Sequence, residues 1–374
     1  MMTVIDRDAP GYDQSPHFQM PALHQERSWR GPALVVFIGA LIFVYPIIES
    51  ILFGPLIPTS EWAFEETGVR SLQSQGLDGS GVHICIVDTG IDLSHPAFSE
   101  VNFGGFLDLV GPDSEGPPME YGDDHHGTMM AGVIVSTGAF QGVAVGVTLS
   151  VAAALGPTGY SVKDGAVGEA VEWCWKTQEA DIISLSLGGE ADPNIAIGGP
   201  TVTSVTDALE SGVLVVAAAG NLGENSSDVS TPASIERVIA VGATDRYGSP
   251  WKDTSRGSPS LNGEQRIDPH MKPEISAPGE NIISTHDPEL GIPYASSSGT
   301  SVSTVFVAGS LALILQKHQS ELIEYQKENG TNSFIDLIKN SLNNSVDSEN
   351  HDSRTGYGFL DAVSWERKIA SSLS

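Results

Sequence analysis

Residues 81–90 read GVHICIVDTG and indicate the class of the fold. From Val82 to Val87 the run is apolar apart from His83, and it is rich in β-branched residues. It then stops at an Asp-Thr-Gly turn. A short apolar run that ends in turn residues is typical of a parallel strand buried on both faces. The pattern therefore predicts a buried strand that carries Asp88 to the edge of a parallel sheet.

Strand-like and helix-like stretches alternate through the rest of the chain, which favours a parallel sheet with helices on both faces. Further strands are expected at 147–154, 182–187, 213–218 and 238–241, and helices at 127–136, 162–177 and 201–210. Residues 300–316 are apolar nearly all round, as in a helix in a membrane or in the middle of a large core. Four hydroxyl side chains at its start favour the core.

The charge of the chain excludes some functions. Its 374 residues include 47 Asp and Glu against 18 Lys and Arg, a net charge of −29. Binding to nucleic acid through phosphates needs clustered cations, so we expect no nucleic-acid partner. The acidity is typical of a soluble surface, or of oxygen ligands for calcium. The two cysteines, Cys85 and Cys174, cannot form a disulfide framework, and we expect buried free thiols.

The N-terminal region has the pattern of a membrane anchor. Residues 31–48 carry no charge, and apolar character resumes at 51–58. Arg27 and Arg30 precede the run and three glutamates follow it, which places the N-terminus in the cytoplasm and the rest outside. We expect a disordered cytoplasmic tail at 1–30, an uncleaved transmembrane signal anchor at 31–58, a linker at 59–65 and one domain at 66–374. A cleaved signal peptide and a buried core helix are the alternatives.

Four chemically distinct side chains lie where loops meet the expected elements. Asp88 ends the first strand, His126 begins a helix, Asn221 follows the strand ending in AAAGN, and Ser301 begins the apolar helix. In open α/β sheets, ligands bind at the carboxyl ends of the strands. Ser301 is expected to attack a carbonyl, His126 to take its proton and Asp88 to orient the imidazole. The side-chain amide of Asn221 and the N–H of Ser301 would donate to the oxyanion.

In this chain order and context, the residues resemble those of the subtilases, the subtilisin-like serine peptidases. The resemblance covers about residues 66–362. Its main blocks are VDTGID (87–92), HGTMMAG (126–132), SLSLGG (184–189), AAAGN (217–221) and SGTSVS (298–303). It implies a three-layer α/β/α fold with a mostly parallel central sheet, preceded here by one transmembrane helix. It also implies hydrolysis of peptide bonds through an acyl-enzyme.

The resemblance further implies how a peptide or protein substrate binds, as a strand added to exposed edges. The matching positions are Ser186, Leu187 and Gly188 on one side and residues 158–160 on the other. Ala218, Ala219 and Gly220 are expected to line the pocket for the residue before the cut, with room for a medium or large apolar side chain. Ordinary small-residue packing is the alternative interpretation of these positions.

Several departures from the family pattern bear on activity. Met129 and Met130 follow the histidine and are expected to face the core. Val305 and Phe306 replace the usual Pro-His after the serine, which motivates an inactive homologue with a binding or scaffold role as the alternative function. An esterase or peptide ligase that uses the same acyl-enzyme is a third reading. Because few residues separate the anchor from Asp88, we also expect folding without a large cleaved propeptide.

No cofactor is expected to be required for the chemistry, and no metal site is assigned. Structural calcium is possible, with oxygen ligands drawn from Asp108, Asp113, Asp123 and Asp124, although solvated acidic loops explain these residues as well. The oligomeric state is not readable from the sequence.

Overall fold

The computed structural model describes residues 34–40, 42, 44–45, 60–112, 114, 116–163, 165–188, 199–346 and 350–374. The chain divides into two units, Met1–Leu56 and Ile57–Ser374. In the first unit the described residues are helical, and large apolar side chains such as Val35 and Phe37 are exposed. The expected tail at 1–30 lies wholly outside the described residues, and the expected anchor at 31–58 lies mostly outside them.

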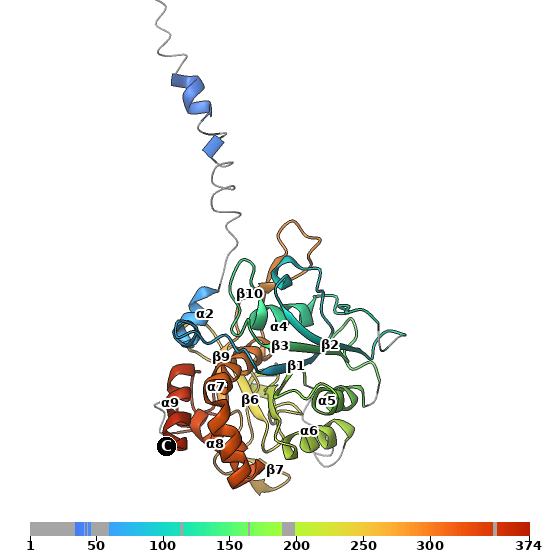
Figure 1. The fold of residues 1–374 in the computed structure, drawn as a ribbon, viewed down its shortest axis with the longest axis vertical. Helices are drawn as coiled ribbons and strands as arrows, with labels where there is room; N and C mark the ends of the chain where they lie inside the picture. The colour runs from blue at the N-terminus through green and yellow to red at the C-terminus, as the bar shows by residue number, and fades with distance from the viewer. Residues whose placement is uncertain are drawn as a thin grey trace, which may run out of the picture. The chain divides into compact units, whose positions relative to one another are not determined.

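A seven-stranded sheet forms the centre of the second unit (Figure 1), in the order β2-β3-β1-β4-β5-β6-β9 with every neighbouring pair parallel. The residues of β1, β3, β4, β5, β6 and β9 are almost all buried, as the apolar runs predict. The strands are β1 (His83–Asp88), β2 (Asn102–Asp108), β3 (Thr148–Ala153), β4 (Ile182–Leu185), β5 (Leu214–Ala218), β6 (Ile239–Thr244) and β9 (Ile275–Pro278).

Helices cover both faces of this sheet, so the chain has the α/β fold with a mostly parallel sheet that the sequence predicts. Helices α4 and α7 pack together on one face, and α5 and α6 pack together on the other (Figure 1). The helices are α2 (Glu61–Glu66), α3 (Val69–Gln73), α4 (His126–Val135), α5 (Ala166–Lys176), α6 (Pro200–Glu210), α7 (Thr300–Asn329), α8 (Thr331–Asn343) and α9 (Ala362–Leu373). Two-stranded ribbons are β7 (Ser260–Leu261) with β8 (Glu264–Gln265), and β10 (Ile282–Thr285) with β11 (Tyr294–Ser297).

Helix α7 is the central helix of the core. Among the described residues it is the one helix long and apolar enough to cross a membrane, and 89% of its most apolar window is buried inside the protein. Residues 300–315 are all buried. The interpretation of 300–316 as a core helix is therefore confirmed.

The compact unit begins earlier than the sequence analysis expected. Most of the expected linker at 59–65 belongs to helix α2, in which Ala63 and Phe64 are fully buried. The ring of Phe64 packs on that of Phe306 in α7, with centroids 5.0 Å apart. A helix of six residues is too short for a clear apolar period in the sequence. Its apolar face is defined by the contact with α7, which the local sequence does not encode.

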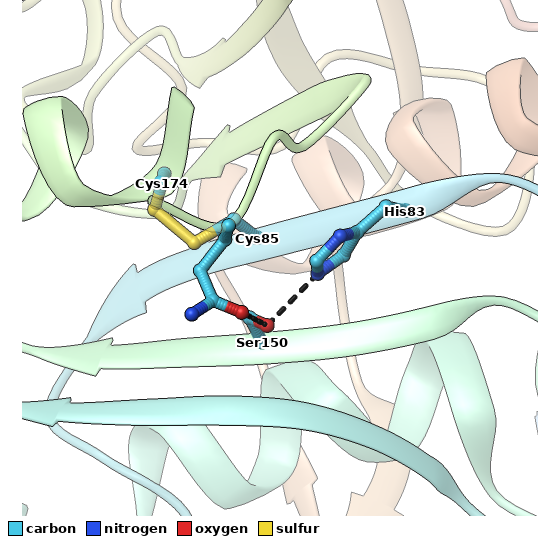
Figure 2. The surroundings of a disulfide bond; sticks show 5 residues. His83, Cys85, Ser150 and Cys174 are labelled. Atoms are coloured by element: carbon cyan, nitrogen blue, oxygen red, sulfur yellow. Dashed lines mark hydrogen bonds between the residues drawn. A yellow bond between two sulfur atoms is a disulfide. The ribbon is translucent and has the colours of Figure 1, made fainter. Parts of the chain in front are cut away.

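Cys85 and Cys174 form a disulfide, which corrects the expectation of free thiols. Cys85 lies in the middle of β1 and Cys174 in α5, which packs across that strand (Figure 2). On the same strand, His83 points toward Ser150 of β3, and its Nε2 lies 2.8 Å from the Ser150 hydroxyl (Figure 2). The cysteines are 89 positions apart, and their contact depends on how α5 crosses β1, which no local pattern encodes.

A fully buried charged cluster joins helix α8 to the edge of the sheet. The Glu274 carboxylate lies 2.9 Å from Lys272 Nζ and 2.6 Å from Lys339 Nζ of α8, and all three side chains have no exposed surface. Both ammonium groups also donate to the carbonyl of Val238. Burial lowers the pKa of Lys272 to about 7, since the attraction of Glu274 only partly offsets the desolvation and Lys339 adds repulsion.

Candidate active site

The order of the strands brings the candidate residues to one edge of the sheet. The chain runs from β1 to β2 at the edge of the sheet, returns to β3 beside β1 and then crosses to β4 on the other side of β1, so the direction of winding reverses beside β1. Such a reversal leaves a crevice at the carboxyl ends of the strands. Asp88 is the last residue of β1, Ser186 follows β4, and Asn221 follows β5.

Asp88 and His126 form a close pair. His126 Nδ1 lies 2.7 Å from Asp88 Oδ1, with the carboxylate fully buried and the imidazole partly exposed to the cleft. The carboxylate therefore fixes the imidazole so that its other nitrogen, Nε2, is left for chemistry. Asp88 Oδ1 also accepts the Thr89 backbone N–H at 2.7 Å, whereas Oδ2 has no partner among the described residues.

Two residues that the sequence analysis did not single out hold the start of helix α4 against β1. Thr89 Oγ1 accepts the N–H of Gly127 at 2.9 Å, which ties the turn after Asp88 to the residue after His126. Glu120 accepts the backbone and hydroxyl protons of Thr128 at 2.7 and 2.8 Å, so a carboxylate caps the positive end of the helix. Their signal in sequence was weak, because a threonine in a turn and a loop glutamate are common.

Negative charge around His126 raises its pKa to about 9. Burial by itself lowers this pKa, since it disfavours the imidazolium. The charge and hydrogen bond of Asp88 outweigh that effect, and the nearby carboxylates of Asp124 and Glu120 add to it. The imidazole is consequently protonated at neutral pH and becomes a base in alkaline solution.

Ser301 lies in the first turn of α7, near the positive end of the helix, with 8% of its surface exposed. Its hydroxyl donates to the carbonyl of Ser186 at 3.0 Å, and the Ser186 hydroxyl donates back to the Ser301 carbonyl at 3.1 Å. This reciprocal pair fixes the start of α7 to the segment after β4. To give its proton to His126, the Ser301 hydroxyl must turn away from Ser186.

Asn221 is anchored through its carbonyl oxygen. Oδ1 accepts the backbone N–H of Thr300 at 3.0 Å and its hydroxyl at 2.9 Å. With the carbonyl end occupied, the amide Nδ2 is the end available to a ligand. Asn221 and Ser301 line the same cleft.

The cleft has a volume of about 640 Å³ and brings together most of the expected substrate-binding residues. From the sequence-derived set it is lined by His126, Ser301, Asn221, Ser186, Leu187, Gly188, Ala218, Gly220 and residues 158–160. Ala219 is not among its lining residues. Its side chain is fully buried, and its backbone forms hydrogen bonds with the backbones of Val241 and Ser230. These contacts keep its side chain away from the surface of the cleft.

Ser230 is one of several lining residues that the expected set does not include. Ser230 borders the cleft although only 3% of its surface is exposed. It lies in a loop between β5 and β6, where nothing in the local sequence distinguishes it from a turn serine. Its N–H donates to the carbonyl of Ala219 at 2.7 Å, so it is joined to the wall that follows β5.

The possible calcium ligands are dispersed. Asp108 is committed to the backbone N–H groups of Val110 and Gly111 and to the Tyr121 hydroxyl. Asp123 and Asp124 are exposed at the cleft, and Asp113 lies outside the described residues. Within the described ranges, no group of three or more His, Cys, Asp or Glu side chains could hold a metal ion.

Comparison with known proteins gives one consistent result. The profile of the subtilase family matches residues 79–358. The serine protease AprX of Bacillus subtilis is 35% identical over 295 residues, covering 70% of this chain and 64% of its own. Subtilisin E of the same species is 35% identical over 254 residues (66% and 59%), and its major intracellular serine protease 34% over 278 residues (72% and 78%). The chain thus spans about three fifths of the length of the first relatives it matches.

Proposed function

We propose that this chain, which belongs to the subtilase family, is a serine endopeptidase whose nucleophile, base and orienting acid are Ser301, His126 and Asp88. The 2.7 Å contact between His126 Nδ1 and Asp88, opposite Ser301 in one cleft, is the observation that carries the proposal. It supplies the orientation that a general base needs. Its relatives are named as serine proteases, which supports a peptide or protein as the substrate of this chain.

In the proposed reaction, Ser301 Oγ attacks the carbonyl carbon of the scissile bond while His126 Nε2 takes its proton. Asp88 stabilises the resulting imidazolium without becoming protonated. The oxyanion accepts hydrogen bonds from Asn221 Nδ2 and the N–H of Ser301. The imidazolium then protonates the leaving amine as the C–N bond breaks, and water, deprotonated by His126, hydrolyses the acyl-enzyme.

The departures from the family pattern are compatible with activity. Val305 and Phe306 are fully buried, and the ring of Phe306 packs on Phe64 of α2. Met129 and Met130 are likewise buried. These substitutions therefore alter the core behind the site rather than the groups in the cleft, which weighs against the inactive-homologue alternative.

We further propose that an N-terminal helix anchors the enzyme and that its catalytic domain faces away from the cytoplasm. The uncharged run at 31–48 and the arginines before it support the anchor and its direction. The Cys85–Cys174 disulfide supports the location, because disulfides persist mainly in oxidising compartments.

Labelling with a fluorophosphonate probe tests the catalytic proposal. Membranes that contain the intact chain or its Ser301→Ala variant are treated at pH 10 to 11, above the pKa of about 9 of His126, and labelled protein is detected in a gel. Labelling that is lost in the variant is the expected result. A folded wild-type protein that takes no label across this pH range would instead support the inactive homologue.

A further inference from the structure

His125 and His286 form a pair of histidines that the proposed reaction does not use. Their rings are in contact, with centroids 5.1 Å apart and planes tilted by 37°. In each ring, Nδ1 is buried and has no hydrogen-bond partner among the described residues. An aromatic contact explains the distance between the rings, but it leaves both nitrogens unsatisfied. Because a buried polar atom without a partner is unfavourable, the pair points to a ligand that both nitrogens can bind.

The surrounding structure fixes the two rings relative to each other. His125 immediately precedes helix α4, and its backbone has the left-handed conformation, with φ 53°. His286 immediately follows strand β10, which packs against α4. The hydroxyls of Ser284 and Thr285 donate to backbone carbonyls in the first turn of α4 at 2.6 and 2.7 Å. The strand end that carries one histidine is therefore bonded to the helix start that carries the other.

The separation of the rings fits two imidazoles bound to one tetrahedral metal ion. A Zn–N bond of about 2.0–2.1 Å, extended by about 1.1 Å from the nitrogen to the ring centre, places each centre about 3.2 Å from the metal. At a tetrahedral angle of about 109°, the two ring centres are then about 5.2 Å apart. The observed distance between His125 and His286 is 5.1 Å. Imidazole nitrogen suits Zn²⁺ and similar transition-metal ions, whereas Ca²⁺ takes oxygen ligands.

The charges of the two chain segments favour a cation. Residues 71–162, which include His125, contain no Lys or Arg, and neither do residues 273–316, which include His286. A carboxylate adjoins each histidine in the sequence, Asp124 before the first and Asp287 after the second. These negative charges attract a divalent ion.

We propose that Nδ1 of His125 and Nδ1 of His286 bind one divalent transition-metal ion of the zinc type, with water in the two remaining tetrahedral positions. The ring proton of each imidazole is then on Nε2. Neither histidine is among the residues that line the catalytic cleft, so the site is separate from the groups of the proposed reaction. The ion joins the ribbon of β10 and β11 to the start of α4. With two protein ligands instead of four, it is exchangeable.

Titration of the full chain with Zn²⁺ tests the site. The Ser301→Ala chain, which cannot digest itself, is purified in detergent micelles, and Zn²⁺ binding is measured by competition with a chromophoric chelator. We expect one site at which Ca²⁺ does not compete. His286→Ala and His125→Asn should each weaken Zn²⁺ binding by at least about 100-fold, because losing a residue that only supports a metal ligand already costs about 10–100-fold. Asn is chosen at position 125 because it tolerates the left-handed backbone.

His83→Ala is the matched control, because it removes a partly buried imidazole whose Nε2 is already engaged by the Ser150 hydroxyl. It should bind Zn²⁺ as the parent does. Electron paramagnetic resonance of the Cu²⁺-loaded chain gives a second readout, with coupling to two imidazole nitrogens in the parent and to one in His286→Ala. The midpoint of urea unfolding without metal checks that each variant is folded.

Three results would overturn the proposal. The first is a folded parent without a Zn²⁺ site, and the second is unchanged Zn²⁺ affinity in folded His286→Ala. The third is binding that is lost in His126→Ala but kept in His286→Ala, which would place the ion on the active-site imidazole instead.

Discussion

The activity of this chain is expected to rise with pH through a midpoint near 9. The base form of His126 is needed to take the serine proton, and surrounding carboxylates raise the pKa of the imidazole to about 9. At pH 7, two units lower, only about 1% of the molecules carry the neutral imidazole. With an uncharged substrate, kcat/KM at pH 7 should therefore be about one hundredth of its alkaline plateau.

Asp124→Asn is the perturbation that tests the cause. The Asp124 charge is one of those that raise the His126 pKa, and it is exposed to solvent. The attraction between the exposed Asp124 carboxylate and the His126 imidazolium, acting mostly through water, is worth about 0.5–1 kcal/mol. Since 1.4 kcal/mol corresponds to one pKa unit, the midpoint should move down by about 0.4–0.7 unit. Activity at pH 7 should then rise about 2.5- to 5-fold, while the alkaline plateau stays unchanged.

The assay is a profile of kcat/KM against pH from 5 to 11, at constant ionic strength. Asp123→Asn is the control, because it removes the same charge from an exposed residue of the same cleft but is not among the main charges that raise the pKa of His126. A wild-type midpoint at or below pH 7 would refute the reasoning. Equal displacement by both variants would also refute it, because the effect would then reflect net charge alone.

Three further predictions concern stability, measured by urea unfolding of the variant without the nucleophile so that the protein does not digest itself. Replacing Cys85 and Cys174 together by Ala should lower the free energy of unfolding by about 4–5 kcal/mol, since the bond closes a loop of 89 positions; equal loss in reductant-treated parent protein is the check. Arg266→Met should lower the free energy of unfolding by about 3–5 kcal/mol, because it leaves the buried carboxylate of Asp228 without its ion-pair partner. A loss below 1 kcal/mol would contradict this. The lowered pKa of Lys272 makes the free energy of unfolding rise by up to about 1.4 kcal/mol per pH unit between pH 7 and 10.5, and Lys272→Met should remove this rise. Parallel curves of stability against pH for variant and parent would contradict this.

The parts of the fold that sequence predicts are those encoded by local periodicity. Strand β1 is six residues long and, apart from its first residue, buried, so its apolar run is unambiguous. Strand β2 was not predicted, because it lies at the edge of the sheet, is mostly only partly buried and contains Gly104 and Gly105 at an irregularity in its pairing. An edge strand faces fewer neighbours, and its composition is correspondingly less constrained.

The candidate site divides in the same way. Asp88, His126, Asn221 and Ser301 could be found because each lies at the end of a recognisable element and in a family motif. Ser230 could not, because it lies in a loop between β5 and β6 whose position depends on the ion pair between Asp228 and Arg266, 38 positions apart. Contacts between distant loops carry no periodic signal, which is also why the disulfide was missed.

The two strongly shifted bases have opposite consequences for stability. His126 has its pKa raised from 6.5 to about 9, so its stabilising effect is complete below pH 6.5 and is lost as pH rises through 9. Lys272 has its pKa lowered from 10.5 to about 7, so its contribution increases over pH 7 to 10.5. Between pH 7 and 9 the folded state holds about one proton more than the unfolded state at His126 and about one proton fewer at Lys272, so the two slopes of stability against pH nearly cancel. The buried lysine cluster therefore offsets the loss of stability that accompanies deprotonation of the active-site imidazole, in the pH range where that imidazole becomes a base.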